Sequence, residues 1–395
     1  MPRRAARAVR SAASISGTIA RLSENEAELA GVLAHEIGHV TERHSAERQV
    51  RATAIGLLGA LLGVAGAGQL ANVGTQLASA QFVQHYSQTQ EFEADSLGVR
   101  YLSRTGYDVR AMASFLAKMR EHTRLQNKIL GRPENAVDEG HFLASHPRTV
   151  DRVEEATELA ARVTGSGTAL NRETYLQHLD GLVFGDDADQ GFIRGRQFIH
   201  TKLGIRFEAP EGFRMINNPD SVIGIGPGNA RFKFDMSPRP YAGSAADYLQ
   251  RVWAAKAQIA GLERFEVNGM EAATARVQVR VEGKPGEGRL IAIKASPDRF
   301  YRFLMTSEPD DAPRLSEGMR HMTYSVRRLS PQEVAQIRPW RIQIHQVQPG
   351  ENVASLSARM AVGEFKEDWF RVLNGLRPGD KVRPGQVVKL VSEAG

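Results

Sequence analysis

Cysteine is absent from the 395-residue sequence. Disulfide frameworks, cysteine-ligated zinc fingers, iron–sulfur clusters and thiol catalysis are therefore excluded. No apolar run reaches the roughly 18 residues that indicate a membrane-spanning helix. A large excess of one charge is also missing, because 51 Lys and Arg residues oppose 45 Asp and Glu residues. The net charge of +6 is too small over this length to indicate a nucleic-acid partner.

Composition and length indicate several folded domains. The sequence is 42% hydrophobic and 24% charged, as is typical of globular proteins. At roughly 150 residues per domain, two or three domains are expected, each large enough to bury a core without disulfides.

Residues 1–22 form an atypical amino-terminal segment without acidic residues. Arginines and serines interrupt every apolar stretch that a secretory signal peptide would need. An Arg-rich, Ser-rich segment is also typical of an organelle transit peptide. The preferred interpretation is a chain that starts late, so that its export signal is not present in this sequence.

Residues 52–90 contain no Asp, Glu, Lys or Arg, and Gly, Ala and Leu dominate their first part. One interpretation is a hairpin over 52–80 that contacts a membrane, since small residues favour tight helix contacts in lipid. The alternative, favoured by Gln69, Asn72 and Gln76, is a pair of buried or gating helices in a soluble domain.

A helix is predicted from Ser23 to about residue 50. Ser23 would cap it, in a capping box with Glu26, and apolar residues at helical spacing follow. The continuous helix places His44, five residues after His39, about 140° away around the axis. His44 is therefore interpreted as a solvated or structural histidine.

His35, Glu36 and His39 carry the chemistry of this helix. Four residues apart, the two histidines lie about 40° apart around the helix and roughly 6 Å apart along it. Two imidazoles in this arrangement can bind one metal ion, and Glu36 can contact a water bound to that ion. The spacing therefore predicts a zinc site.

A catalytic zinc site needs a third protein ligand and one open position. A third histidine in the spacing His-x-x-Gly-x-x-His is excluded, because Glu42 and Ser45 occupy the required positions. A glutamate from a separate helix is the other source, and residues 90–95 provide one directly after the uncharged segment.

The motifs HEIGH (35–39), EFEAD (91–95) and SHPRTVDR (145–152) resemble the zinc peptidase family that contains the CAAX prenyl endopeptidase, HtpX and the bacterial envelope protease BepA. The resemblance implies that Glu91 is the third zinc ligand and that Asp95, one turn later, orients a ligand from the second shell. Glu93 lies 200° from Glu91 on a helix and is not expected to share the site.

The same resemblance implies roles for His146 and Arg152 beside Glu36, the catalytic base. His146 would stabilise the oxyanion or occupy the fourth zinc position in a resting state. Arg152 would brace the site, and the alternative is an ion pair with Asp151 or Glu155. The family's strand before the zinc helix is not supplied by 11–22, so a chain that lacks this cleft edge is expected to be misfolded or inactive.

The remaining sequence predicts two further domains. Residues 196–335 show period-two patterning with helices near 244–260 and 311–323, and a hairpin turn at 282–288, which indicates an α+β domain of unknown role. This part is similar to small binding domains of the PsbP/Mog type. In residues 341–393, the motifs QPGENVASLSARM (348–360), FRVLNGL (370–376) and RPGQVVKLV (383–391) resemble a LysM module. This resemblance implies binding to peptidoglycan.

The predicted fold class is multidomain. A mainly α-helical gluzincin-type metallopeptidase domain (23–170) precedes a connector (171–195), an α+β domain with an antiparallel sheet (196–335) and a small βααβ LysM-like module (341–393). The predicted function is a zinc-dependent endopeptidase with one Zn²⁺ per chain, acting on unfolded envelope proteins in the periplasm or at the membrane of a bacterial cell envelope. The alternative is a non-catalytic peptidoglycan-binding or chaperone-like protein that keeps the metallopeptidase scaffold.

Overall fold

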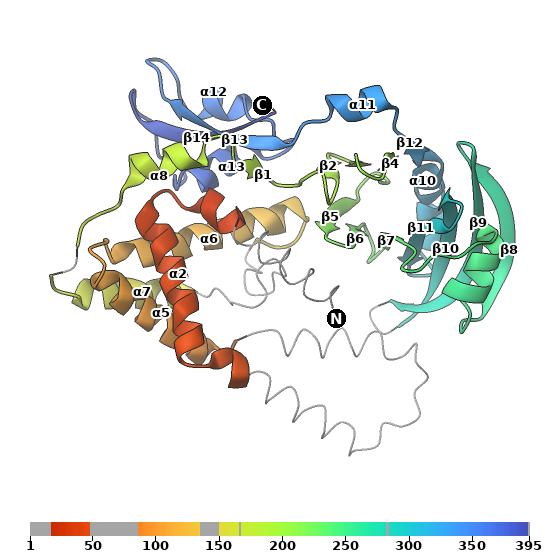
Figure 1. Cartoon of the computed structure of the whole chain (residues 1–395), viewed down its shortest axis with the longest axis horizontal. Helices are drawn as coiled ribbons and strands as arrows, with labels where there is room; N and C mark the ends of the chain where they lie inside the picture. The colour runs from red at the N-terminus through yellow and green to blue at the C-terminus, as the bar shows by residue number, and fades with distance from the viewer. Residues whose placement is uncertain (1–16, 48–85, 135–149, 166, 282–283, 394–395) are drawn as a thin grey trace. The chain divides into compact units, whose positions relative to one another are not determined.

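A computed structural model describes residues 17–47, 86–134, 150–165, 167–281 and 284–393 (Figure 1). They form two compact units. The helical unit comprises Ala12–Phe184 together with Arg341–Ser392, and the sheet unit is formed mainly by Gly185–Trp340. Within the described ranges, none of the helices is both long and apolar enough to cross a membrane. The predictions for 52–80 and His146 lie outside the described residues.

The helical unit contains a bundle in which α2 packs against α5 and α6, and α7 packs against the same two helices (Figure 1). Their apolar faces share a buried cluster that includes Val99, Leu102, Met112 and Ala156. The labelled helices of this unit that precede the sheet unit in the sequence are α2 (Glu26–Thr41), α5 (Gln88–Ser103), α6 (Arg110–Ile129), α7 (Val150–Arg162) and α8 (Arg172–Leu179).

The predicted start of α2 is wrong by two residues. Asn25, not Ser23, is the N-cap, and its side chain accepts a hydrogen bond from the Glu28 backbone N–H at 2.9 Å. The Ser23 hydroxyl instead donates to the carbonyl of Ile19 at 3.0 Å, because residues 17–22 already form a helical segment of their own. The helix is therefore capped by a side chain two residues later than predicted, and the Glu28 carboxylate accepts from the Glu24 backbone N–H rather than from the N-cap residue.

The predicted continuation of this helix to about residue 50 is also wrong. The helix ends at Thr41, and Arg43 adopts the left-handed region with φ of 58°. Residues 44–47 then form a further helical turn in a new direction. His44 is consequently displaced from the face that a continuous helix would give it.

The carboxy-terminal segment has the strand–helix–helix–strand order that the sequence predicts. Strand β13 (Trp340–Gln346) pairs with the antiparallel β14 (Val387–Ser392), and β1 (Val183–Phe184) completes a sheet of order β1-β13-β14. Helices α12 (Val353–Ala358) and α13 (Lys366–Leu373) connect the two long strands. The likeness to a LysM module stays a prediction.

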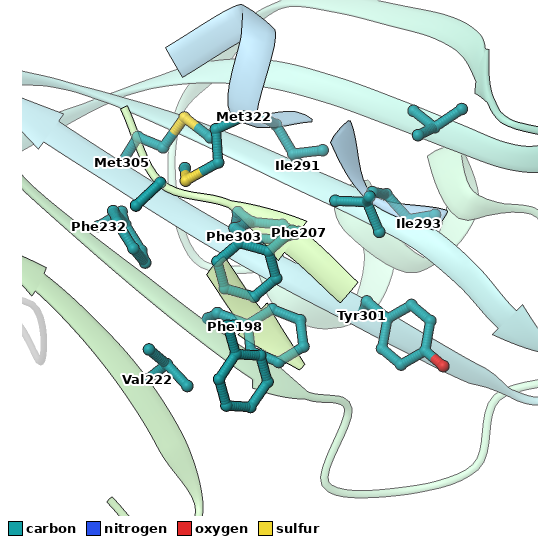
Figure 2. Close-up of a cluster of buried hydrophobic side chains, with 14 of the residues drawn as sticks. Phe198, Phe207, Val222, Phe232, Ile291, Ile293, Tyr301, Phe303, Met305 and Met322 are labelled. Carbon is teal, nitrogen blue, oxygen red and sulfur yellow. The ribbon is translucent and has the colours of Figure 1, made fainter. Parts of the chain in front are cut away.

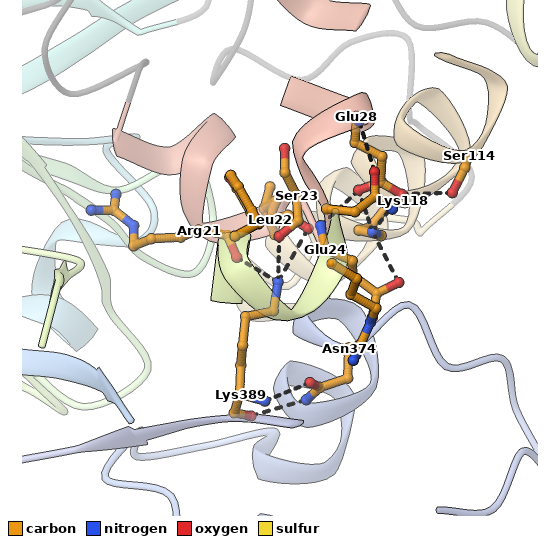
Figure 3. A network of polar contacts seen from close by, with 12 residues as sticks. Arg21, Leu22, Ser23, Glu24, Glu28, Ser114, Lys118, Asn374 and Lys389 are labelled. Carbon is orange, nitrogen blue, oxygen red and sulfur yellow. Dashed lines mark hydrogen bonds and ion pairs between the residues drawn. The ribbon is translucent and has the colours of Figure 1, made fainter. Parts of the chain in front are cut away.

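Strand β14 is fixed to the chain segment that enters α2 through the side chain of Lys389 (Figure 3). Its ammonium donates to the carbonyls of Arg21 at 2.9 Å and Ser23 at 2.8 Å, and it is fully buried. Nearby, Lys118 of α6 pairs with Glu28 of α2 at 2.7 Å. Charged groups from three distant segments of sequence therefore meet at the start of α2.

The sheet unit contains a seven-stranded sheet of order β5-β6-β7-β11-β10-β9-β8 and a four-stranded sheet of order β12-β4-β3-β2. All strand pairs with an assigned register in the two sheets are antiparallel, as the sequence predicts. The strands are β2 (Phe192–Arg194), β3 (Gln197–His200), β4 (Ile205–Glu208), β5 (Arg214–Asn218), β6 (Ser221–Ile225), β7 (Arg231–Met236), β8 (Ile259–Val267), β9 (Met270–Val281), β10 (Lys284–Ser296), β11 (Arg299–Ser307) and β12 (Arg327–Arg328).

The core of this unit lies between its sheets and helix α10 (Ala312–Ser325) (Figure 2). Phe198 and Phe207 come from the small sheet, Phe303 from the large sheet, and Met322 from α10. All four side chains are at most 1% exposed. Burying large aromatic side chains from both sheets is the main stabilising contribution here, at about 25 cal/mol for each Å² of apolar surface.

Two local predictions in the sheet unit are wrong. The helix predicted over 244–260 is shorter, since α9 (Ala245–Tyr248) and the π-helical turn η3 (Leu249–Trp253) end before β8 begins at Ile259. The predicted hairpin is present as β9 and β10, but its turn is shorter than 282–288, since β10 begins at Lys284 and its Pro285 pairs with Arg280. Proline is tolerated there because β11 pairs with β10 only from Glu287 onward. Helix α11 (Pro331–Gln336) ends the unit.

Candidate metal centre

The site depends on the close approach of α2 and α5. A Cβ atom on Gly38 would lie 3.2 Å from the Cα of Ala94, and one on Gly98 would lie 3.4 Å from the backbone nitrogen of His35. Glycine at both positions therefore lets the two backbones come together. This contact brings the EFEAD segment of α5 against the HEIGH segment of α2.

His35, His39 and Glu91 converge in the contact between these helices. Their ligand atoms all lie within 4.8 Å of one another, and all three residues are buried. The two Nε2 atoms are 3.0 Å apart, and they lie 3.6 Å (His35) and 3.5 Å (His39) from carboxylate oxygens of Glu91. Among the residues that the structure describes, these three form the one group of His, Asp and Glu side chains arranged to hold a metal ion.

The donor set fits zinc. Tetrahedral bonds of about 2.0–2.1 Å to nitrogen and oxygen place neighbouring ligand atoms about 3.3 Å apart. The three measured separations, 3.0, 3.5 and 3.6 Å, bracket this value. Two imidazole nitrogens and one carboxylate also match the ligand types of catalytic zinc sites.

Asp95 and Arg152 support the cluster from behind. The Oδ1 of Asp95 lies 2.8 Å from the Nδ1 of His35, which leaves Nε2 directed into the cluster. Arg152 of α7 donates to both Asp95 oxygens, at 2.7 and 2.8 Å, and its third nitrogen lies 2.7 Å from Glu91. The guanidinium thus links the candidate ligand Glu91 to the residue that orients the candidate ligand His35.

The charges of this group are mutually stabilised. Burial alone would raise the pKa of Asp95, but hydrogen bonds from Arg152 and His35 hold it below its usual value. Burial would lower the pKa of Arg152, yet its hydrogen bond to Asp95 and the charges of Asp95, Glu91 and Glu36 raise it. Asp95 and Arg152 therefore remain an ion pair, although each is at most 3% exposed.

The other face of the site contains two residues that the sequence analysis did not assign to it. His44 is 2% exposed, and its Nδ1 lies 2.9 Å from the Nδ1 of His39. Of the two interpretations of His44, the solvated one is wrong and the structural one agrees with its burial, because the turn at Arg43 places its ring against His39. The ring of Tyr86 stacks on His39 at a centroid distance of 3.9 Å.

The remaining predicted residues lie as follows. Glu36 is exposed on α2, next to His35 in the sequence, and its charge contributes to raising the pKa of Arg152. Glu93 is not one of the three candidate metal ligands, as predicted. Its carboxylate lies 3.2 Å from the Nε2 of His44. His146 lies outside the described residues.

Comparison with known proteins identifies the family of this region. Residues 11–160 match the model of peptidase family M48. The chain is 35% identical over 162 residues to the β-barrel assembly-enhancing protease of Yersinia pestis, which covers 39% of this chain and 31% of that protein. Its identity to the protease of the same name from Escherichia coli K12 is 34% over 165 residues, covering 40% of this chain and 32% of the relative.

Solved structures show a weaker likeness. The cyanobacterial PsbP protein of Synechocystis superposes with a TM-score of 0.27 at 13% identity, covering 35% of this chain and 98% of that one. The cell-envelope biogenesis protein LpqN of Mycobacterium tuberculosis gives a TM-score of 0.26 at 11% identity, with 32% and 83% coverage. At such TM-scores the likeness supports no conclusion about this chain.

The match to the curated relatives is partial but contains the cluster. The chain spans about a third of the length of the two proteases, 31% and 32%. The matched region includes HEIGH and EFEAD, so the family predicted from these motifs is confirmed. Residues 11–160 of this chain thus match peptidase family M48, with the HExxH motif included, and are similar to the β-barrel assembly-enhancing proteases.

Proposed function

We propose that the protein is a zinc-dependent endopeptidase. The observation that carries the proposal is the convergence of His35, His39 and Glu91, buried and within 4.8 Å of one another, beside the exposed Glu36. These three residues would hold one Zn²⁺ per chain. Bound there, zinc supplies the Lewis acidity that polarises a scissile carbonyl and brings the pKa of water to near 7.

The chain's own residues then have distinct roles. Glu36 accepts a proton from the attacking water and passes it to the leaving amine, so it acts first as a base and then as an acid. Asp95 holds the ring of His35, and Arg152 holds Asp95 and Glu91, so both are assigned positioning roles. The oxyanion role of His146 stays part of the proposal on sequence grounds.

We further propose that the substrates are unfolded proteins of a bacterial cell envelope, in the periplasm or at the membrane. Support comes from the relatives, whose name describes proteases that enhance β-barrel assembly. Binding of peptidoglycan by 341–393 is a separate proposal, supported by the LysM-like sequence and the strand–helix–helix–strand order.

The test replaces Glu36 by Gln. Because the amide cannot accept the proton, we expect casein cleavage to fall by a factor of about 100 or more while zinc content stays at one ion per chain. Glu42→Gln is the matched control, since Glu42 is an exposed glutamate at the end of the same helix. Full cleavage by Glu36→Gln would refute the assignment, and a wild-type chain that binds zinc but cleaves nothing would favour the non-catalytic alternative.

A further inference from the structure

The hydrogen bonds of His39 extend away from the candidate metal site. Its Nε2 lies in the cluster, 3.0 Å from the Nε2 of His35, while its Nδ1 contacts the Nδ1 of His44 at 2.9 Å. The Nε2 of His44 is in turn 3.2 Å from a carboxylate oxygen of Glu93. His39, His44 and Glu93 therefore form a continuous chain of contacts that leads from the cluster to the surface.

The chemistry of neutral imidazole gives this chain a direction. A ring nitrogen that binds a metal carries no proton, so the proton of His39 must be on Nδ1. Nδ1 then donates to the Nδ1 of His44, which accepts. The proton of His44 is consequently on Nε2, where it donates to the carboxylate of Glu93. Both contacts in the chain from His39 through His44 to Glu93 then have one donor and one acceptor, and the two Nε2 atoms of His35 and His39 are left as acceptors for a metal ion.

The opposite direction does not work for two neutral rings. If His44 donated from Nδ1, its bare Nε2 would face the carboxylate of Glu93. The proton of His39 would then be on Nε2, directed at His35 and Glu91, where it would block a metal ion. The contacts thus favour the tautomer of His39 that binds metal.

We propose that His44 and Glu93 are positioning residues for His39, setting its tautomer and ring orientation. Asp95 does the same for His35, so each histidine of the site has its own partner on the far side of the ring. The two partners differ, because Asp95 is 1% exposed and ion-paired whereas the Glu93 side chain is 51% exposed, beside a surface cavity of about 470 Å³. The inference rests on the proposed zinc site.

The turn at Arg43 is the structural cause of this arrangement. A continuous helix would direct His44 away from His39, whereas the helix is interrupted at Arg43, with φ of 58°, and His44 is buried. Tyr86 covers one face of the His39 ring and its hydroxyl lies 2.8 Å from Ser45, the residue after His44. The ring of His39 is thus held by stacking and by a hydrogen bond at its edge.

The test measures the zinc dissociation constant of the full chain by competition with a chelator. His44→Phe keeps an aromatic ring but removes both nitrogens, whereas His44→Gln keeps an acceptor and a donor on one side chain. We expect His44→Phe to weaken zinc binding by a factor of about 10–100, and His44→Gln to recover most of that loss. The thermal midpoints of the metal-free chains check that folding is unchanged.

Replacing Glu93 gives a second test that does not disturb the buried ring. Glu93→Ala should weaken zinc binding about 3–10-fold, a smaller loss because its contact is one step further from the metal. Glu47→Ala is the matched control, since Glu47 lines the same cavity and its carboxylate accepts from Gln90. We expect this control to bind zinc as the wild type does.

The outcomes separate this inference from the proposed function. If the wild-type chain binds no zinc, the proposed function fails. If the wild type binds zinc and the zinc dissociation constant of His44→Phe is within a factor of about two of the wild-type value, His44 has no positioning role. Only the inference is then overturned. If His44→Phe does not fold, equal zinc affinities of Glu93→Ala and Glu47→Ala overturn it instead.

Discussion

Arg152 is the residue on which the support of the site depends most. It is 3% exposed and pairs with Glu91 and Asp95, two carboxylates that are themselves at most 1% exposed. Removing one partner of a buried charge group leaves the others uncompensated, which costs far more than the group contributes as a whole. The guanidinium therefore serves both the stability of the fold and the orientation of Glu91 and His35.

Replacement of Arg152 by Met tests this role. We expect the free energy of unfolding of the metal-free chain to fall by about 3–5 kcal/mol, because two buried carboxylates lose their counter-charge. The measurement is urea unfolding followed by circular dichroism. Arg162→Met, near the end of the same helix, is the control.

Arg162 is a suitable control because its side chain is 73% exposed and pairs only on the surface with Glu158. Its replacement should change the free energy of unfolding by no more than about 0.5 kcal/mol. An equal decrease in the free energy of unfolding for Arg152→Met and Arg162→Met would show that Arg152 does not stabilise the buried carboxylates.

The two histidines could be predicted from the sequence because their spacing is local, one turn of a helix apart. The choice of Glu91 and Asp95 within residues 90–95 comes from the family resemblance and not from spacing. His44 and Tyr86 could not be found in this way. Their approach to His39 depends on a left-handed residue at Arg43, and arginine gives no sequence signal for that conformation.

At the scale of elements, strand β14 stabilises the entry to α2 through Lys389. The ammonium donates to three successive carbonyls, those of Arg21, Leu22 and Ser23. These carbonyls lie at the carboxy-terminal end of the helical segment 17–22. A positive charge is favourable at this end of a helix, because the carbonyl groups there carry partial negative charge. Burial nevertheless lowers the pKa of Lys389 to about 7.

This pKa predicts how stability varies with pH. Between about pH 7 and 10.5 the unfolded chain holds the proton of Lys389 and the folded chain has released it. The unfolded state binds more protons in this window, so the free energy of unfolding rises with pH there, by up to about 1.4 kcal/mol per pH unit. Below pH 7 both states are charged and the contribution no longer changes.

Denaturant unfolding of the wild type and Lys389→Met at pH 7, 8 and 9 measures the effect. We expect the free energy of unfolding to rise more steeply with pH in the wild type than in Lys389→Met over this window, because Met has no proton to release. Lys381→Met, an exposed lysine in the same segment, should keep the wild-type slope. A wild-type slope in Lys389→Met would contradict the assignment.

Helix lengths were the weakest part of the sequence prediction. No proline stands between Ser23 and Val50 to predict an earlier end, yet the helix ends at Thr41 because Arg43 leaves the helical region. Over 259–260 the apolar residues were assigned to a helix, although they begin a strand paired with β9. In both places tertiary packing decides between local alternatives that the residue pattern leaves nearly equal.

At the scale of the molecule, the sequence predicts a helical peptidase part, an antiparallel α+β part and a small carboxy-terminal segment. The described residues cluster into two units, and 341–392 pack with the helical part although the sheet unit separates them in sequence. Composition cannot reveal this association. It depends on contacts such as Lys389 with Ser23, whose partners are more than 360 residues apart.

The central claim is that two histidines of α2 and one glutamate of α5 hold a single zinc ion. Counting zinc per chain by native mass spectrometry tests it most directly, with Glu91→Gln compared to the wild type. Glu121→Gln, an exposed glutamate on α6, is the control. The account predicts one zinc ion in the wild type and the control and none in Glu91→Gln. A full zinc ion in Glu91→Gln, or none in the wild type, would contradict it.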